Sequence, residues 1–245
     1  MKQHSIQIIG TYLEDLKELL LDRGIEVESV INKITLMLNK SACRLVGVFS
    51  HFYNSQNMVE CEMQNEVFRN LTKKIKNKLL HISSSESVLL TDKYNYSMVR
   101  CGIAMYGYTS NYKEKKYLYP ALKVFATVIQ KNIIIKGECV GYSSNYQAKH
   151  REEIYVLNCG YYDGFSRLLA CNGYSCNNKK IYYCGNICMD MLAIKCQKKL
   201  SINESVCLLD NADKLAKICK TIPYEILTNI KPERFIYIIK KPFHV

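Results

Sequence analysis

The hydrophobic pattern of the chain changes at residues 108–118, and this change constrains the fold more than any other feature. Before it, stretches with apolar residues at helical spacing alternate with short apolar runs, which is typical of parallel β/α units. After it, short segments rich in β-branched and aromatic residues are separated by Gly, Asn and Ser. The sequence therefore predicts an α/β part, residues 1–112, followed by an all-β part, residues 113–245.

The positions of the individual elements follow from the same periodicities. In the first part, helices are predicted at 11–24, 27–38 and 64–78, strands at 45–49 and 79–82, and another apolar run at 98–106. In the second part, strands are predicted at 124–135, 154–157, 181–183, 191–194 and 205–209, followed by a helix at 212–219 and a final segment from residue 224.

The charge of the chain raises the question of an acidic partner. There are 34 Lys and Arg residues against 22 Asp and Glu, which gives a formal net charge of +12. Such a charge suits nucleic acid or a membrane surface when it is gathered on one face. Here the lysines are scattered along the chain, as solvated surface lysines are. We therefore expect no nucleic-acid partner; steeply salt-dependent binding to nucleic acid would be the sign of one.

Twelve cysteines raise the possibility of disulfides or a metal site, and their spacing argues against both. No C-x-x-C occurs, and Cys184 with Cys188, although spaced like zinc ligands, lack a second pair. Without a secretory signal, such cysteines are most simply reduced, half-buried small apolar residues. There is also no long apolar run at the amino terminus. The sequence thus predicts no metal, no membrane span and a cytoplasmic location.

Four ordered motifs in the second part point to a known family. They read G-E-C-V-G-Y-S-S-N-Y at 137–146, N-C-G-Y-Y-D-G-F-S-R at 158–167, G-N-I-C-M-D-M at 185–191 and T-I-P-Y-E-I-L-T at 221–228. They resemble the G-E-x-V-G-Y-G-x-x-Y, G-Y-A-D-G-Y-x-R, G-R-x-x-M-D-M and T-x-x-Y-E-I-L-T motifs of alanine racemases. Four matches in order over about a hundred residues are far more specific than any single short motif.

The first part carries weaker matches to the same family, whose members bind pyridoxal 5'-phosphate. The segments are G-V-F-S-H-F at 47–52, H-I-S-S-S at 81–85 and V-R-C-G-I-A-M-Y-G at 99–107. By this resemblance His51 packs beside the cofactor ring and Arg100 faces its pyridine nitrogen. Ser85, Gly102 and Ile103 hold the phosphate. The fold implied is part of a TIM-type (β/α) barrel, its later strands, followed by the family's carboxy-terminal β domain.

The family reaction explains why a tyrosine is needed in the second part. Racemising an amino acid means removing the α proton from one face and delivering a proton to the other, so two acid/base groups on opposite sides are the minimum. The resemblance implies that one is the cofactor-bearing lysine and that the other is Tyr142, which reaches in from the partner subunit of a homodimer. Tyr161 and Met189 correspond to residues that touch the substrate. The substrate implied is alanine, although serine racemases share these motifs.

Several of these residues also have an ordinary structural interpretation. Tyr142 is one of 19 tyrosines, and only its flanking motif favours descent from the catalytic residue. His51 is as readily a satisfied core histidine as a neighbour of the cofactor, and Ser85 could be a helix cap. Asp163 and Asp190 are interpreted as turn-forming residues rather than catalytic ones.

One family motif is missing. The segment K-A-N-x-Y-G-H-G, whose lysine carries the cofactor, does not occur, and the early lysines Lys2, Lys17, Lys33 and Lys40 lie in unrelated contexts. K-x-D-T-G-M-x-R-x-G is absent too; D-R-G-I at 22–25 is its nearest counterpart, with Val27 in place of the arginine. We therefore expect an amino-terminally shortened family member that is inactive alone. The alternatives are half of a split racemase, completed by a partner chain, and a non-catalytic cofactor- or phosphate-binding protein.

Overall fold

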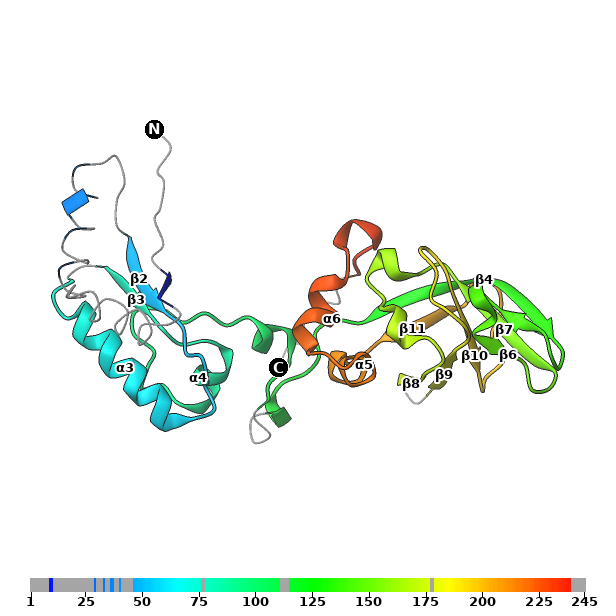
Figure 1. The fold of residues 1–245 in the computed structure, drawn as a ribbon, viewed down its shortest axis with the longest axis horizontal. Coiled ribbons are helices and arrows are strands. Elements are labelled where there is room, and N and C mark those ends of the chain that lie inside the picture. The colour runs from blue at the N-terminus through cyan, green and yellow to red at the C-terminus, as the bar shows by residue number, and fades with distance from the viewer. Residues whose placement is uncertain are drawn as a thin grey trace. The chain divides into compact units, whose positions relative to one another are not determined.

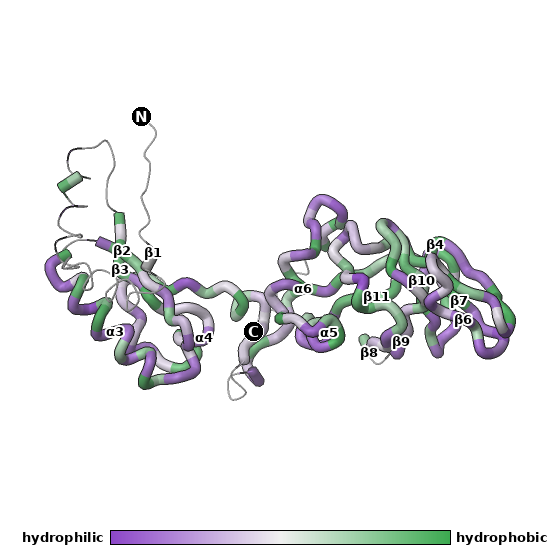
Figure 2. Tube along the Cα trace, in the orientation of Figure 1, coloured by the Kyte–Doolittle hydropathy of each residue, from purple (hydrophilic) through white to green (hydrophobic). Residues whose placement is uncertain are grey.

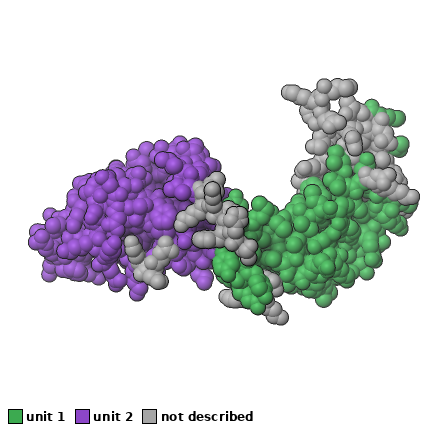
Figure 3. Space-filling model, turned by 180° about the vertical axis from the view of Figure 1, so that it is seen from behind, with its two compact units in different colours: residues 1–119 green, residues 120–245 purple. Residues whose placement is uncertain are grey.

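A computed structural model of the chain describes residues 9–10, 29, 33, 36–37, 40, 46–75, 78–110, 115–176 and 179–238. It divides into two compact units, Met1–Tyr119 and Pro120–Val245, called unit 1 and unit 2 below (Figure 3). The helix predicted at 11–24 and the D-R-G-I segment lie outside the described residues. Of the helix predicted at 27–38, residues 29, 33, 36 and 37 are described and are helical.

Unit 1 is built on three parallel strands, β1 (Ile9–Gly10), β2 (Gly47–Ser50) and β3 (Leu79–His81), in the order β1-β2-β3 (Figure 1). Phe49 of β2 lies opposite both Ile9 of β1 and His81 of β3. Parallel neighbours need crossover connections, and helix α3 (Met58–Thr72) supplies the one between β2 and β3. The predicted α/β character of the first part is confirmed.

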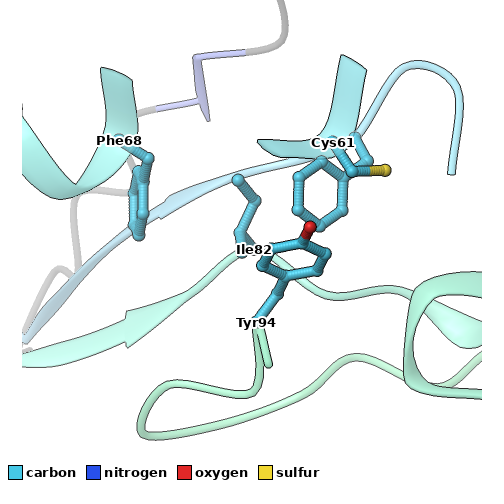
Figure 4. Packing of buried hydrophobic residues seen from close by; sticks show 5 residues of the cluster. Cys61, Phe68, Ile82 and Tyr94 are labelled. Carbon is cyan, nitrogen blue, oxygen red and sulfur yellow. The ribbon is translucent and has the colours of Figure 1, made fainter. Parts of the chain in front are cut away.

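Helix α3 begins and ends six residues before the predicted helix at 64–78. Its start is fixed by Asn57, whose side chain accepts hydrogen bonds from the backbone N–H groups of Val59 and Glu60. The buried face of α3 brings Cys61 and Phe68 into one cluster with Ile82 and Tyr94, together with Phe52 (Figure 4). This cluster is the core beneath the carboxyl ends of β2 and β3.

The segment after β3 positions the residues discussed below. Helix α4 (Ser85–Leu90) has Ser84 as its N-cap in a capping box with Ser87, so the idea that Ser85 is itself the cap is wrong. Residue 100 then pairs with Ser84 in an isolated parallel bridge. The apolar run predicted at 98–106 does not continue as a strand, because the chain turns at Gly102 into the 3₁₀ helix η1 (Ile103–Tyr106).

Unit 2 is a mainly antiparallel β structure. Its six-stranded sheet has the order β11-β4-β7-β10-β9-β8, and a separate two-stranded hairpin joins β5 to β6. The strands are β4 (Val124–Ile134), β5 (Cys139–Val140), β6 (Tyr146–Gln147), β7 (Glu152–Leu157), β8 (Gly173–Cys176), β9 (Lys179–Tyr183), β10 (Leu192–Cys196) and β11 (Ser205–Leu209). Figure 2 shows hydrophobic stretches along this sheet alternating with hydrophilic turns.

The predicted all-β character of the second part is confirmed, and the predicted helix at 212–219 is found as α5 (Ala212–Cys219). A second helix, α6 (Pro223–Asn229), and the 3₁₀ helix η6 (Pro232–Arg234) follow it. All cysteines in the described part of the chain are free thiols, and no group of its side chains could hold a metal ion. None of the helices described is both long and apolar enough to cross a membrane.

Candidate functional site

In unit 1, Arg100 is the centre of a compact group at the carboxyl ends of β2 and β3. Its Nη2 donates to the backbone oxygen of Ser50 (2.8 Å) and lies 2.9 Å from Nδ1 of His51. Its Nη1 contacts Nδ1 of His81 and lies 3.3 Å from the backbone oxygen of the same residue. The guanidinium also lies over the ring of Phe49, which stacks on His81. Arg100 is thus held on several sides.

These contacts fix the state of both histidines. A guanidinium has only donors, so Nδ1 of His51 and of His81 must each accept, which requires neutral imidazoles. Partial burial lowers the pKa of both side chains, and the charge of Arg100 lowers it further. His51 is exposed, so the interpretation of it as a satisfied core histidine is wrong; its partner is Arg100.

One N–H donor of Arg100 is available to a ligand. The Nε–H group of its guanidinium has no hydrogen-bond partner among the described residues, whereas both terminal nitrogens are engaged. Burial lowers the pKa of Arg100, but the ordinary value is so basic that the guanidinium stays a cation. Such a group can donate to an acceptor with a lone pair, and it disfavours protonation of any base placed against it.

Ser85 and the start of η1, which begins three residues after Arg100 in the sequence, form a second group in unit 1. The Ser85 side chain is buried, and its Oγ accepts from the backbone N–H groups of Gly102 (2.9 Å) and Ala104 (3.3 Å). The N–H group of Ile103 has no partner among the described residues. A Cβ added to Gly102 would meet nothing within 4 Å, so this backbone borders open space. Clustered backbone N–H groups of this kind suit an anion.

In unit 2, Tyr142 lies on the turn that links β5 to β6. The turn contains the short 3₁₀ element η3 (Tyr142–Ser144), preceded by Gly141 at φ 74°. Ser143 and Ser144 also have left-handed φ angles of 61° and 51°, a conformation that costs non-glycine residues about 1–2 kcal/mol each. Tyr142 itself is 77% exposed. The turn presents the ring to solvent, free of the core.

Tyr161 and Met189 lie on two further turns that are bonded to each other. The N–H of Tyr161 donates to the backbone oxygen of Cys188 (2.9 Å), and the N–H of Tyr162 donates to that of Met189 (2.9 Å). Gly160 makes this approach possible, since a Cβ there would lie 2.3 Å from the Cys188 oxygen. Tyr161 and Met189 are 46% and 55% exposed. The structure therefore brings these two predicted residues side by side.

A third link ties the Met189 turn to the Tyr142 turn. The side-chain Nδ2 of Asn186 donates to the backbone oxygen of Tyr142 (2.9 Å), and its Oδ1 accepts from Asn145 (2.7 Å). Gly185, at φ 75°, lets the two turns touch, because a Cβ there would lie 2.4 Å from the Val140 oxygen. Within unit 2, the three residues expected to meet the substrate thus belong to one interlocked set of turns.

Asp163 has the structural role expected of it. Its buried carboxylate accepts from the N–H of Gly160 (2.8 Å) and from Nε of Arg234 (2.9 Å). It therefore closes the turn that carries Tyr161 and joins this turn to η6. The ion pair also raises the pKa of Arg234.

A buried network supports the other side of the Tyr142 turn. Tyr146, at the end of the turn, donates to the carboxylate of Glu152, and Lys195 donates to both the Tyr146 hydroxyl (2.8 Å) and Glu152 (3.3 Å). Burial, then the contact with Glu152, raises the pKa of Tyr146 to about 12. Burial alone would raise the pKa of Glu152, but the bonds from Tyr146 and Lys195 outweigh it and lower that pKa.

Among the residues of these groups that were not singled out from the sequence are His81 and Asn186. His81 opens the H-I-S-S-S segment, and its place in the motif was the available signal. Asn186 occupies the position of an arginine in the G-R-x-x-M-D-M motif, so the motif gave no hint of its contact with Tyr142.

Comparisons with known proteins agree with the geometry. Residues 23–110 match the model of the alanine racemase N-terminal domain, and residues 121–237 match that of the C-terminal domain. The alanine racemase of Borreliella burgdorferi is 30% identical over 224 residues, which are 84% of this chain and 60% of that protein. That of Staphylococcus carnosus is 31% identical over 199 residues, covering 75% of this chain and 52% of the relative.

Solved structures show the same fold. The alanine racemase of Bacillus anthracis with bound L-Ala-P superposes with a TM-score of 0.79 at 24% identity, over 94% of this chain and 63% of that one. The Bartonella henselae enzyme with covalently bound pyridoxal phosphate gives 0.73 at 23% identity, over 94% and 65%. The chain thus spans 60% or less of the length of the two curated relatives above.

Proposed function

We propose, from the premise that this chain belongs to the alanine racemase family, that it carries the cofactor-binding and tyrosine-bearing parts of an amino-acid racemase that interconverts L- and D-alanine. The observation that carries the proposal is that unit 1 contains both Arg100, held by two neutral histidines, and the backbone N–H groups around Ser85. These residues stand at the motif positions that the family uses for pyridoxal 5'-phosphate. The fold and the motif order support the same assignment.

The residues present fit this cofactor. Ser85 with the backbone of Gly102 and Ile103 would hold the phosphate. The Ile103 N–H has no partner among the described residues, the Ser85 hydroxyl can donate as well as accept, and the backbone at Gly102 borders open space. Arg100 would direct its unpartnered Nε–H at the pyridine nitrogen and keep that nitrogen unprotonated. His51, bonded to Arg100, would pack beside the ring. When bound, the cofactor supplies a sink for the electron pair left by removal of the α proton.

On the substrate side, Tyr142 would exchange a proton with the α carbon at one face, and Tyr161 and Met189 would border the amino acid. We propose that Tyr142 does so across a homodimer, acting on the amino acid bound in the partner subunit. The domains proposed are residues 1–112, the later part of a TIM-type barrel, and residues 113–245, the β domain. The free thiols fit a reducing compartment, and we propose a cytoplasmic location.

The motif whose lysine is the second acid/base group does not occur among these 245 residues. K-A-N-x-Y-G-H-G does not occur in the sequence, and Lys33 and Lys40, the early lysines that the structure describes, are exposed. We therefore propose that the polypeptide of residues 1–245 binds the cofactor without turning over alanine. The lysine could come from a partner chain, as in a split racemase. The alternative is a non-catalytic protein that binds the cofactor or phosphate.

Replacing Ser85 by Ala tests the phosphate site. The variant loses a buried hydroxyl that organises two backbone N–H groups, and hydrogen bonds to charged groups are worth about 1.5–3 kcal/mol. We therefore expect the Kd for pyridoxal phosphate, measured by absorbance titration, to rise at least about tenfold. Inorganic phosphate should compete with the cofactor.

Ser97→Ala is the matched control, because Ser97 also accepts a backbone N–H in unit 1 (from Leu80, 3.2 Å) but lies outside the motif. It should leave the Kd unchanged. Equal affinities for the wild type and Ser85→Ala would show that the phosphate is not held here.

A further inference from the structure

The backbone of the turn that carries Tyr142 adopts a conformation that its residue types disfavour locally. It contains three positions with positive φ, Gly141, Ser143 and Ser144, and only Gly141 is glycine. The related motif has glycine at the position of Ser143, where this chain has a β-carbon. An isolated turn of this composition would relax toward negative φ, so contacts from elsewhere must stabilise it.

Asn186 supplies such contacts from the neighbouring turn. Its amide donates to the backbone oxygen of Tyr142 at one end and accepts from the side chain of Asn145 at the other. One side chain thereby bridges Tyr142 and Asn145, the residues on either side of Ser143 and Ser144. The amide suits the task because it offers a donor and an acceptor on the same group.

The backbone around Asn186 is placed closely enough for the bridge to be rigid. Gly185 packs against the backbone of Val140 and leaves no room for a Cβ. A Cβ added to Gly141 would lie 3.6 Å from the backbone nitrogen of Asn186. Asn172, by comparison, donates to two backbone oxygens in unit 2, those of Leu168 and Ala170, and among the described residues its side chain makes no bond to the Tyr142 turn.

We propose that Asn186 is a positioning residue for Tyr142, which fixes the backbone of the tyrosine and hence the direction in which its hydroxyl is presented. The family motif has arginine at this position, and a guanidinium cannot accept the bond from Asn145, so the two-sided bridge depends on the asparagine of this chain. An effect of Asn186 on catalysis rests on the proposed function of Tyr142. The bridge itself is independent of cofactor and substrate.

The test uses the full chain labelled with 3-fluorotyrosine and observed by ¹⁹F NMR, with the Tyr142 resonance assigned by its loss in Tyr142→Phe. In Asn186→Asp the donor to the Tyr142 oxygen is replaced by a carboxylate oxygen of the same size, and in Asn186→Ala the bridge is removed. We expect both variants to shift, split or broaden the Tyr142 resonance. The resonances of buried tyrosines such as Tyr174 and Tyr183 should stay in place, which shows that unit 2 remains folded.

Asn172→Ala is the control and should leave the Tyr142 resonance where it is in the wild type. An unchanged Tyr142 resonance in both Asn186 variants would overturn the proposal, and so would an equal change in Asn172→Ala. Because this readout needs no cofactor, it separates failure of the bridge from failure of the proposed function, which the pyridoxal phosphate titration reports.

Discussion

Replacing Tyr142 by Phe is expected to lower racemisation of alanine about 10²–10⁴-fold, the usual contribution of one positioned acid/base group. The measurement needs a chain that has the second group. A chimera would therefore join to this chain a first part that carries the K-A-N-x-Y-G-H-G motif. The loss follows from removing the only proton-transferring atom of the side chain while keeping its ring.

Hydrogen exchange at the α carbon makes the result specific. With Tyr142 gone, the lysine should still exchange the α hydrogen of one enantiomer with deuterated solvent, whereas conversion to the other enantiomer is lost. Tyr119→Phe is the control, since Tyr119 is 79% exposed and outside every motif. Racemisation by Tyr142→Phe at the rate of the parent chimera would remove Tyr142 from the mechanism.

Replacing Glu152 by Gln should destabilise unit 2 by about 2 kcal/mol at pH 7, because the buried carboxylate loses charge-assisted bonds from Tyr146 and Lys195. The effect should depend on pH. The folded-state pKa of Glu152 lies below its ordinary value of 4.5. A lowered carboxyl pKa stabilises the fold fully above the ordinary value, and the contribution disappears as the pH falls through the folded-state pKa.

The difference in free energy of unfolding between the wild type and Glu152→Gln should therefore be constant from pH 7 to about pH 5 and shrink below the ordinary pKa. Guanidinium unfolding between pH 3 and pH 7 measures it. Glu233→Gln, at an exposed carboxylate, should show no comparable difference. A gap that grows toward low pH would mean that Glu152 is not held as a carboxylate in the fold.

Elements with a strong period were predictable from the sequence. Strand β11 and helix α5 were found at the predicted residues, because each has one clear apolar face. The start of α3 was missed because 58–63, M-V-E-C-E-M, has no regular period and the signal was the cap at Asn57. The hairpin of β5 and β6 has only two residues per strand, too few for an alternating pattern to show.

The candidate site was predictable only as far as the motifs reach. They gave Arg100, Ser85 and Tyr142, but not the contacts that hold them. The neutral state of His81, its contact with Arg100 and the bridge from Asn186 each depend on segments that are distant in sequence and meet only in the fold. Side-chain hydrogen bonds between such segments leave no periodic trace in a single sequence.

The most direct test of the account is to incubate the purified polypeptide of residues 1–245 with pyridoxal phosphate and alanine, then treat a sample with borohydride. The account predicts saturable cofactor binding that inorganic phosphate competes with, no lysine specifically labelled by reduction, and no interconversion of L- and D-alanine. One lysine labelled stoichiometrically, together with racemisation by this polypeptide alone, would contradict it.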